Sequence, residues 1–341
     1  MQEMTVRTPR RAPDVPPTGQ TTNSRRKPRH CPWHHRRVTV AAGKGYQYLH
    51  GCVRQSNCGS GISLLKAQRL AVLPIDSYDL DSEFSTLDDH EYGGEYDTFT
   101  FGSWSSHVLA NGTGADSDTS FRPHDGHMAL TELGKKLPGI MSLVTEHFPL
   151  DRLQWVRIFR ASDAILAPHV DFLEWDKPGT RLQIPLRTSE DSLHSENAVV
   201  YHLRRGEVWK IHTTDPHSTR SSAETARLSL CLDFSDAEEP IEIRKEIPAT
   251  EPIRIIERPE ATEAELEELL NIGRNFTPAT MRSDFRRFAE LHFERRSHAA
   301  TTYDWYAEAA RRSGDAGVVA KARAFRTYCI EKRADGETFH W

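Results

Sequence analysis

The sequence predicts a mainly β domain followed by a helical C-terminal region. Three observations favour this fold class. Apolar-rich runs typical of strands recur between residues 153 and 234. In the last run, from Arg227 to Phe234, leucines occupy every second position from 228 to 232, as on a half-buried strand. After residue 260 the signals are those of helices, beginning with the capping box Thr262-x-x-Glu265.

The length and charge of the chain bound its organisation. A chain of 341 residues with 37% apolar residues can bury a sizeable core in one large domain or two. Residues 1–60 contain 11 Lys/Arg and two acids, a charge of +9, so residues 61–341 contain 33 Lys/Arg and 47 acids, a charge of −14. We expect residues 1–61 to be a basic, disordered extension. The acidic remainder argues against nucleic acid as a partner, and a basic arm that binds acidic surfaces is the alternative.

The sequence also indicates where the protein acts. It contains no run of 18 apolar residues and no N-terminal signal with an apolar core. The cysteines near the basic extension, Cys31, Cys52 and Cys58, are too irregularly spaced for a zinc site of the CxxC type. We therefore expect a cytoplasmic protein with no membrane association and no structural disulfides.

Strands and turns are expected from residue 62 onward. Short apolar runs at 64–72 and 75–80 and an aromatic-rich run at 92–109 come first, and a helix is expected near 128–137. The central strands are predicted at 182–186, 198–203, 207–211 and 227–234, with a further strand before His169 that carries Arg157. His194 falls between the strands in this prediction.

The C-terminal region is predicted to hold four helices. The first follows the Thr262 cap, and the second begins at Thr277-Pro278 with Phe285 and Phe288 on one face. Two more are expected at 302–312 and 318–330. We expect this small subdomain to pack against the β domain or to mediate a homodimer.

A candidate metal site lies within the β region. His169 and Asp171 are two residues apart, so on an extended segment both side chains point to one side, and a distant strand is expected to deliver His217. Two imidazoles and one carboxylate form the facial triad of non-haem Fe(II) oxygenases. The rival cluster His124-Asp125-Gly126-His127 has the composition of an exposed turn at a helix start. Arg227, ten residues beyond His217, could pair with the distal carboxylate of a dicarboxylic co-substrate.

Several motifs in order carry a family resemblance. They are Leu166-Ala-Pro-His-Val-Asp-Phe172, Arg181-Leu-Gln-Ile-Pro-Leu186, Gly206-Glu-Val-Trp209, Pro216-His-Ser218 and Arg227-Leu-Ser-Leu-Cys-Leu-Asp-Phe234. The chain resembles the aspartyl/asparaginyl and proline hydroxylase family, and within it the bacterial L-proline 3-hydroxylases, from about Ile62 to Trp341. The resemblance implies a double-stranded β-helix (jelly-roll or cupin) core over residues 62–240, and a linker with a helical subdomain over residues 241–341. It also implies Fe(II), 2-oxoglutarate and O₂ as cofactors.

The resemblance also implies roles for individual residues. His169, Asp171 and His217 are expected to hold iron, and Arg227, His194 and Arg181 to bind 2-oxoglutarate. Arg157 and Arg181 are expected to contact the substrate carboxylate. No catalytic group beyond the iron ligands is implied. Gln183 departs from the pattern, because many relatives have His there, and the polar segment Thr213-Thr214-Asp215 suggests a substrate with more hydrogen-bonding groups than proline.

The expected reaction is hydroxylation of a free L-amino acid, with release of succinate and CO₂. Proline or pipecolate is the first choice of substrate, and a polar linear amino acid such as citrulline or arginine the second. Two alternatives remain open: a peptidyl Asp/Asn β-hydroxylase, and a cupin-fold binding protein without turnover. The carbon that is hydroxylated and the stereochemistry are not predicted.

Overall fold

The computed structural model describes residues 65–88, 97–119, 124, 127–171, 179–222, 225–235, 240–333 and 337–341. The expectations for residues 1–61, including the basic extension and its three cysteines, lie outside this range. The strands are β1 Gln68–Val72, β2 Thr100–Asn111, β3 Ala129–Leu130, β4 Leu153–His169, β5 Gly179–Arg187, β6 Ser192–Glu196, β7 Val199–His202, β8 Glu207–Lys210, β9 His217–Ser221, β10 Arg227–Ser235 and β11 Arg254–Ile255. The α-helices are α1 Asp81–Asp88, α2 Glu132–Lys135, α3 Pro138–His147, α4 Glu263–Asn271, α5 Met281–Glu294, α6 Thr301–Arg312 and α7 Ala316–Arg326. A π-helix, Thr327–Glu331, continues α7, and short 3₁₀ turns occupy Ile75–Ser77 and Ile272–Asn275.

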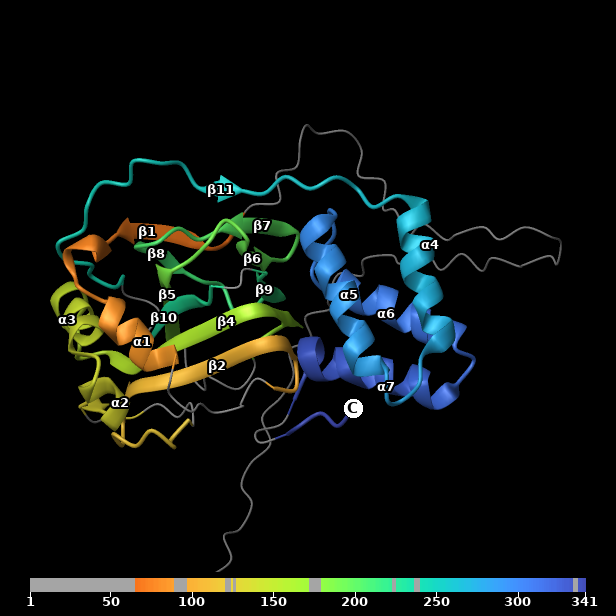
Figure 1. Ribbon diagram of the computed structural model, residues 1–341, viewed down its shortest axis with the longest axis horizontal. Helices are drawn as coiled ribbons and strands as arrows, with labels where there is room; N and C mark the ends of the chain where they lie inside the picture. Colours follow the sequence, from red (N-terminus) through yellow and green to blue (C-terminus); the bar gives the residue numbers. More distant parts are fainter. Residues whose placement is uncertain are drawn as a thin grey trace, which may run out of the picture. The chain divides into compact units, whose positions relative to one another are not determined.

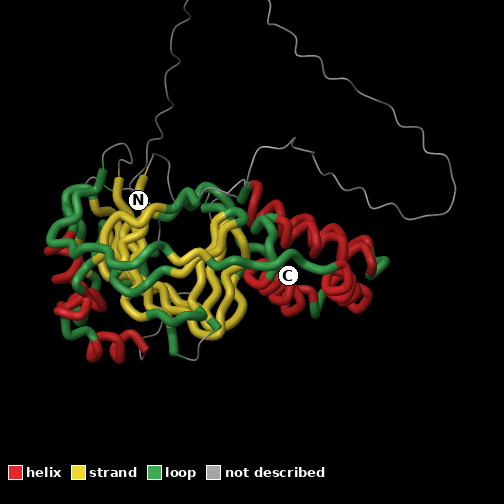
Figure 2. Tube along the Cα trace, turned by 90° about the horizontal axis from the view of Figure 1, so that it is seen from above, coloured by secondary structure: helices red, strands yellow, loops and turns green. Residues whose placement is uncertain are grey.

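The strands form one antiparallel sheet that curls on itself (Figure 2). Their order is β1-β8-β5-β10-β4-β9-β6-β7-β11, with β2 pairing β3 and β4. Helices α1 to α3 lie at one end of the sheet and α4 to α7 at the other (Figure 1). The predicted fold class, a mainly β jelly-roll core with a C-terminal helical region, is confirmed.

In the central strands, apolar and polar residues alternate, so the side chains that pack in the core and the polar side chains lie on opposite faces of the sheet. In β10, Leu228, Leu230 and Leu232 are fully buried in a core cluster that includes side chains from α1, α2 and α3. Arg227 and Asp233, which have the other parity in the same strand, therefore lie on the opposite face, towards the interior of the curled sheet. β5 follows the same rule, with Leu182, Ile184 and Leu186 in the cluster and Arg181 and Gln183 opposite. β5 and β10 consequently present buried polar side chains to the interior of the sheet.

A second core cluster joins the sheet to the C-terminal helices. Phe99, Phe101 and Trp104 from the region of β2 belong to the same buried cluster as Phe285 of α5 and Tyr303 of α6. The Phe101 and Phe285 rings stack with their centroids 5.5 Å apart. The helical region thus shares its hydrophobic core with the sheet.

Several local expectations are confirmed and others need correction. The Thr262 capping box opens α4, and α5, α6 and α7 match the other predicted helices. The helix expected at 128–137 is wrong in extent, because residues 129–130 pair with β2 and only 132–135 are helical after the Thr131 cap. His194 does not lie between strands but within β6, whereas His202 lies in β7, within the strand expected at 198–203. In the described part of the chain, no helix is long and apolar enough to cross a membrane, and its two cysteines, Cys231 and Cys329, are buried and not joined in a disulfide.

Candidate metal centre and active site

The candidate metal ligands come together at the end of β4. His169 is the last residue of that strand and lies opposite His217, the first residue of β9. Asp171 follows two residues later, and one ligand atom from each of the three side chains lies within 4.8 Å of the others. All three side chains are buried. Among the described residues, no other group of three His, Cys, Asp or Glu meets this geometry.

Hydrogen bonds orient both imidazoles for metal binding. Nδ1 of His169 lies 2.9 Å from the carbonyl oxygen of Ala167, and Nδ1 of His217 lies 3.0 Å from that of Asp215. A carbonyl only accepts, so each Nδ1 carries the proton and each Nε2 keeps its lone pair. His ligands in metal sites are oriented in this way by a second hydrogen bond. The donor set therefore fits a divalent transition metal.

The electrostatics of the site favour the deprotonated ligands. Burial opposes charge on Asp171, but Arg181 and the two imidazoles outweigh it and hold the pKa of Asp171 well below its usual value. Burial, reinforced by the neighbouring His169, lowers the pKa of His217 to about 3. At neutral pH the site therefore presents one carboxylate and a neutral His217, the ionisation states that metal binding requires.

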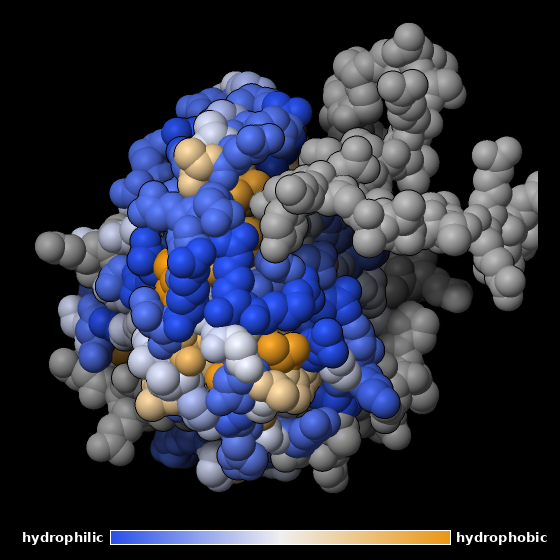
Figure 3. Space-filling view, turned by 90° about the vertical axis from the view of Figure 1, so that its right-hand side faces the viewer, coloured by the Kyte–Doolittle hydropathy of each residue, from blue (hydrophilic) through white to orange (hydrophobic). Residues whose placement is uncertain are grey.

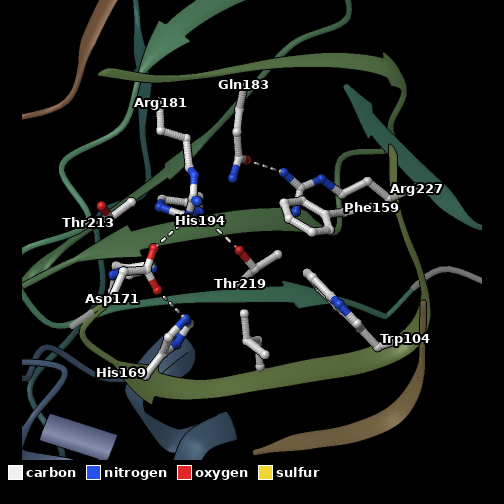
Figure 4. Close-up of a pocket in the computed structure, with 12 residues that line it drawn as sticks. Trp104, Phe159, His169, Asp171, Arg181, Gln183, His194, Thr213, Thr219 and Arg227 are labelled. Carbon is white, nitrogen blue, oxygen red and sulfur yellow. Dashed lines mark hydrogen bonds and ion pairs between the residues drawn. The ribbon is translucent and has the colours of Figure 1, made fainter. Parts of the chain in front are cut away.

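The three candidate ligands line one pocket (Figure 4). Arg181 and Gln183 enter it from β5, His194 from β6, Thr219 from β9 and Arg227 from β10. Trp104 and Phe159 form an aromatic wall beside Arg227 (Figure 4). Of the polar segment before His217, only Thr213 lines the pocket; Thr214 and Asp215 do not.

Arg227 is a buried cation with no acidic partner in the part of the chain that the structure describes. It is 3% exposed, and its guanidinium Nη2 lies 3.4 Å from Oε1 of Gln183 (Figure 4). In the described part of the chain no carboxylate forms an ion pair with it. Burial lowers the pKa of Arg227 to about 10, so the group is still charged at neutral pH. A buried charge without a partner is costly, and a carboxylate ligand would remove that cost.

His194 offers a second unused polar atom. Its Nδ1 lies 2.9 Å from Oγ1 of Thr219, while its Nε2 is buried without a hydrogen-bond partner among the described residues. Burial, together with the neighbouring His217 and Arg227 side chains, lowers the pKa of His194 well below its usual value, so the ring is neutral. Arg227 and His194 together fit an anionic, hydrogen-bonding co-substrate.

Arg181 and Arg157 are held in a buried chain of alternating charge. Nη1 of Arg181 donates to Oδ2 of Asp171 at 2.5 Å, and its Nε donates to Oδ1 of Asp233 at 2.7 Å. Arg157 donates to the other oxygen of Asp233. Arg157 is only 1% exposed and is not among the pocket-lining residues. The predicted direct contact between Arg157 and the substrate is therefore not what the geometry favours.

The sequence reasoning missed Asp233 and Thr219. Asp233 has the same strand parity as Arg227, which is the signal that could have placed it inside the sheet. Of the rival cluster at residues 124–127, the structure describes His124 and His127. The backbone N–H and Nε2 of His124 both bond to Gln154, so His124 is engaged elsewhere than in a metal site.

Comparisons with known proteins place this site in a family. Residues 240–337 match the family model described as L-proline 3-hydroxylase, C-terminal. The chain is 30% identical over 271 residues to an L-proline cis-4-hydroxylase of Rhizobium meliloti, covering 79% of this chain and 97% of that protein. The chain belongs to the proline hydroxylase family. The chain is also 31% identical over 257 residues to an L-proline cis-3-hydroxylase of a Streptomyces species, covering 72% of this chain and 88% of that protein.

The predicted enzyme class is thereby confirmed: this family member is a dioxygenase. A solved 2OG-Fe(II) oxygenase from Burkholderia pseudomallei is similar at 11% identity and a TM-score of 0.31, over 49% of this chain and 84% of that one. A likeness at that level adds nothing to the assignment, which rests on the relatives above.

Proposed function

We propose that this dioxygenase hydroxylates a free L-amino acid, with proline or pipecolate as the first choice. The observation that carries the proposal is one pocket holding both the His169, Asp171 and His217 cluster and a buried Arg227 that has no carboxylate partner among the described residues. When bound, Fe(II) with 2-oxoglutarate and O₂ supplies the oxidising power for attack on a C–H bond. The protein itself has to bind and orient the substrate and the co-substrate and to exclude water from the pocket.

The chain's own residues divide this work. Nε2 of His169, Nε2 of His217 and the Asp171 carboxylate would hold the iron, and three protein ligands leave positions open for co-substrate and O₂. Arg227 would pair with the distal carboxylate of 2-oxoglutarate, and Nε2 of His194 would bind another of its oxygens.

Arg181 is proposed to bind anionic groups that enter the pocket, either the 2-oxoglutarate or the substrate carboxylate. Its attachment to Asp171 and Asp233 fixes the guanidinium in the pocket wall. Arg157 would then act by holding Asp233 in place. Thr213 is the pocket residue that could bind a further polar group on the substrate.

Anaerobic reconstitution with Fe(II), followed by O₂, 2-oxoglutarate and a panel of free L-amino acids, tests the reaction. We expect succinate and a product heavier by one oxygen atom from proline or pipecolate. Succinate without a hydroxylated panel member would still support an oxygenase, but it would indicate that the substrate is a peptide or a carrier-bound residue. Absence of succinate under all conditions would contradict the proposal.

Substitutions test the residue roles. His169→Ala, Asp171→Ala and His217→Ala should each abolish iron-dependent succinate formation. Arg227→Ala should instead raise the half-saturating 2-oxoglutarate concentration by roughly 30-fold or more, because losing one partner of a buried charge pair costs about 2 kcal/mol or more. His202→Gln is the matched control, since His202 is buried in β7 but does not line the pocket. Full activity in His217→Ala would disprove the proposed ligand set.

A further inference from the structure

We infer that Tyr303, in α6 of the C-terminal region, is a positioning residue for the metal ligands. The inference rests on the metal role proposed above for His169 and Asp171. It gives the helical region a part in the active site that neither its sequence nor its distance along the chain suggests. The argument starts from how the ligand segment is held.

The segment that carries His169 and Asp171 lies where the sheet ladder stops. β4 ends at His169, and the β4–β9 pairing is already irregular between Leu166 and His169. Val170 and Asp171 therefore have no strand pairing of their own. The backbone N–H of Asp171 donates to the carbonyl oxygen of Thr213, in the turn between β8 and β9, at 3.0 Å.

The C-terminal region binds the residues on both sides of His169. The Tyr303 hydroxyl donates to the carbonyl oxygen of Pro168 at 2.5 Å. The backbone N–H of Val170 donates to the carbonyl oxygen of Cys329 at 3.0 Å. Cys329 lies in the π-helix Thr327–Glu331, and such helices occur frequently at functional sites. His169 is thus held between two hydrogen bonds to residues more than 130 positions away in the sequence.

Tyr303 is well suited to this role. It is fully buried, and burial raises the pKa of Tyr303 well above its usual value, so the hydroxyl remains a donor throughout the physiological range. The His169 ring is also packed against Phe99, with centroids 4.8 Å apart, and the Arg333 guanidinium lies 5.4 Å from the centroid of Phe99. The helical region therefore holds the backbone on both sides of His169, while Phe99, from the region of β2, packs against its ring.

The same helix supplies a matched control. Tyr306 lies three residues after Tyr303, is also fully buried, and donates its hydroxyl to the backbone carbonyl of Met281 at 2.8 Å. Both tyrosine rings contact Phe285, with centroids 5.2 and 5.0 Å away. Tyr303→Phe and Tyr306→Phe thus remove equivalent hydrogen bonds, but only the first one reaches the ligand segment.

The test is a titration of the full-length, metal-free protein with Co(II), beside thermal unfolding of the same samples without metal. We expect both variants to lower the melting temperature by similar small amounts. Tyr303→Phe alone should weaken Co(II) binding, by about tenfold, the size of effect typical when the support of a metal ligand is removed. Normal Co(II) affinity in Tyr303→Phe, or equal weakening in both variants, would overturn the inference.

The ligand proposal is checked in the same experiment. His217→Ala should lose Co(II) binding whatever the role of Tyr303. If His217→Ala bound Co(II) like the unmodified protein, the proposed metal centre itself would be wrong. If His217→Ala lost binding and Tyr303→Phe did not, only the positioning role would be wrong.

Discussion

At the scale of single residues, Asp233 is the buried group on which the charges of the site depend. It is fully buried and accepts hydrogen bonds from both Arg157 and Arg181. Burial alone would raise the pKa of Asp233, but the two guanidinium groups outweigh it and lower the value. Arg181 in turn contacts Asp171. A change at Asp233 should therefore be felt at the metal ligand.

We predict that Asp233→Asn destabilises the fold by about 3 kcal/mol or more, since it leaves two buried guanidinium groups short of a negative charge. Urea unfolding measures the change. Asp163→Asn is the control, because the Asp163 carboxylate pairs with Arg286 at 2.6 Å on the surface, with 71% of its side chain exposed. Such a pair is worth about 1 kcal/mol or less. Equal losses in the two variants would contradict the role assigned to Asp233.

The pH dependence of this effect follows from the direction of the pKa shift. The pKa of Asp233 is lower in the folded than in the unfolded chain, so its contribution to stability is present above the unfolded value of about 4. It is lost as the pH falls through the folded value. The difference in unfolding free energy between wild type and Asp233→Asn should therefore shrink in acid.

At the scale of elements, the bulge between β2 and β4 depends on Gly102. Its φ is +98°, in a region that side-chain-bearing residues rarely adopt. A Cβ atom there would lie 1.9 Å from the backbone oxygen of Asp163 in β4. The strand pair can therefore keep its register only with glycine at this position.

We predict that Gly102→Ala destabilises the protein by several times more than Gly314→Ala. Gly314 also has positive φ, +74°, but a Cβ atom there meets nothing within 4 Å. Its substitution should cost only the backbone strain, about 1 kcal/mol. The difference between the two free energies of unfolding isolates the close approach of β2 to β4. Equal costs would mean that the bulge relaxes freely.

The elements also show what the sequence could predict. β5 and β10 were found because leucine and isoleucine alternate there, and the Thr262 cap was found from local chemistry. β6, Ser192–Glu196, was missed, and the strand expected to carry His217 was given no bounds, because β6 and β9, His217–Ser221, are almost wholly polar. Their strand structure comes from pairing with neighbours on both sides, which periodicity does not report.

The residues of the site likewise fall into those that the sequence could predict and those that it could not. His169, Asp171, His217 and Arg227 could be selected because few residue types bind metals or dicarboxylates, and the motifs fix their order. Asp233 and Tyr303 could not, because their roles depend on which strand or helix folds against them. Arg157 shows the converse, since its parity places it inside the sheet but only the structure pairs it with Asp233.

At the scale of the whole molecule, the sheet and the C-terminal helices share one hydrophobic cluster. We therefore predict that they unfold together. In hydrogen exchange at increasing denaturant, amides of β10 and α6 should lose protection at the same concentration. Co(II) at about 100 times its dissociation constant should raise the free energy of unfolding by roughly 2.7 kcal/mol. The amides of β10 and of α6 should report the same increase, although the metal binds beside the sheet. Earlier loss of protection in α6, unmoved by metal, would show two independent units.

The hydrophilic appearance of the helical face bears on assembly. Residues drawn in Figure 3 on this side are mostly hydrophilic, with small separate apolar patches. A broad apolar surface is the usual mark of a permanent interface. The homodimer expected from the sequence therefore stays a prediction, and this face gives it no support.

The alternation in β5 and β10 has a consequence for laboratory evolution. One parity of residues, the leucines and isoleucines, carries the packing against α1 to α3, and the other parity carries chemistry. A mutant library at Gln183 and Ser229 would therefore vary the interior face while the packing face stays unchanged. Because substrate range and thermal robustness rest on different side chains of the same strands, selection can act on one while the other persists.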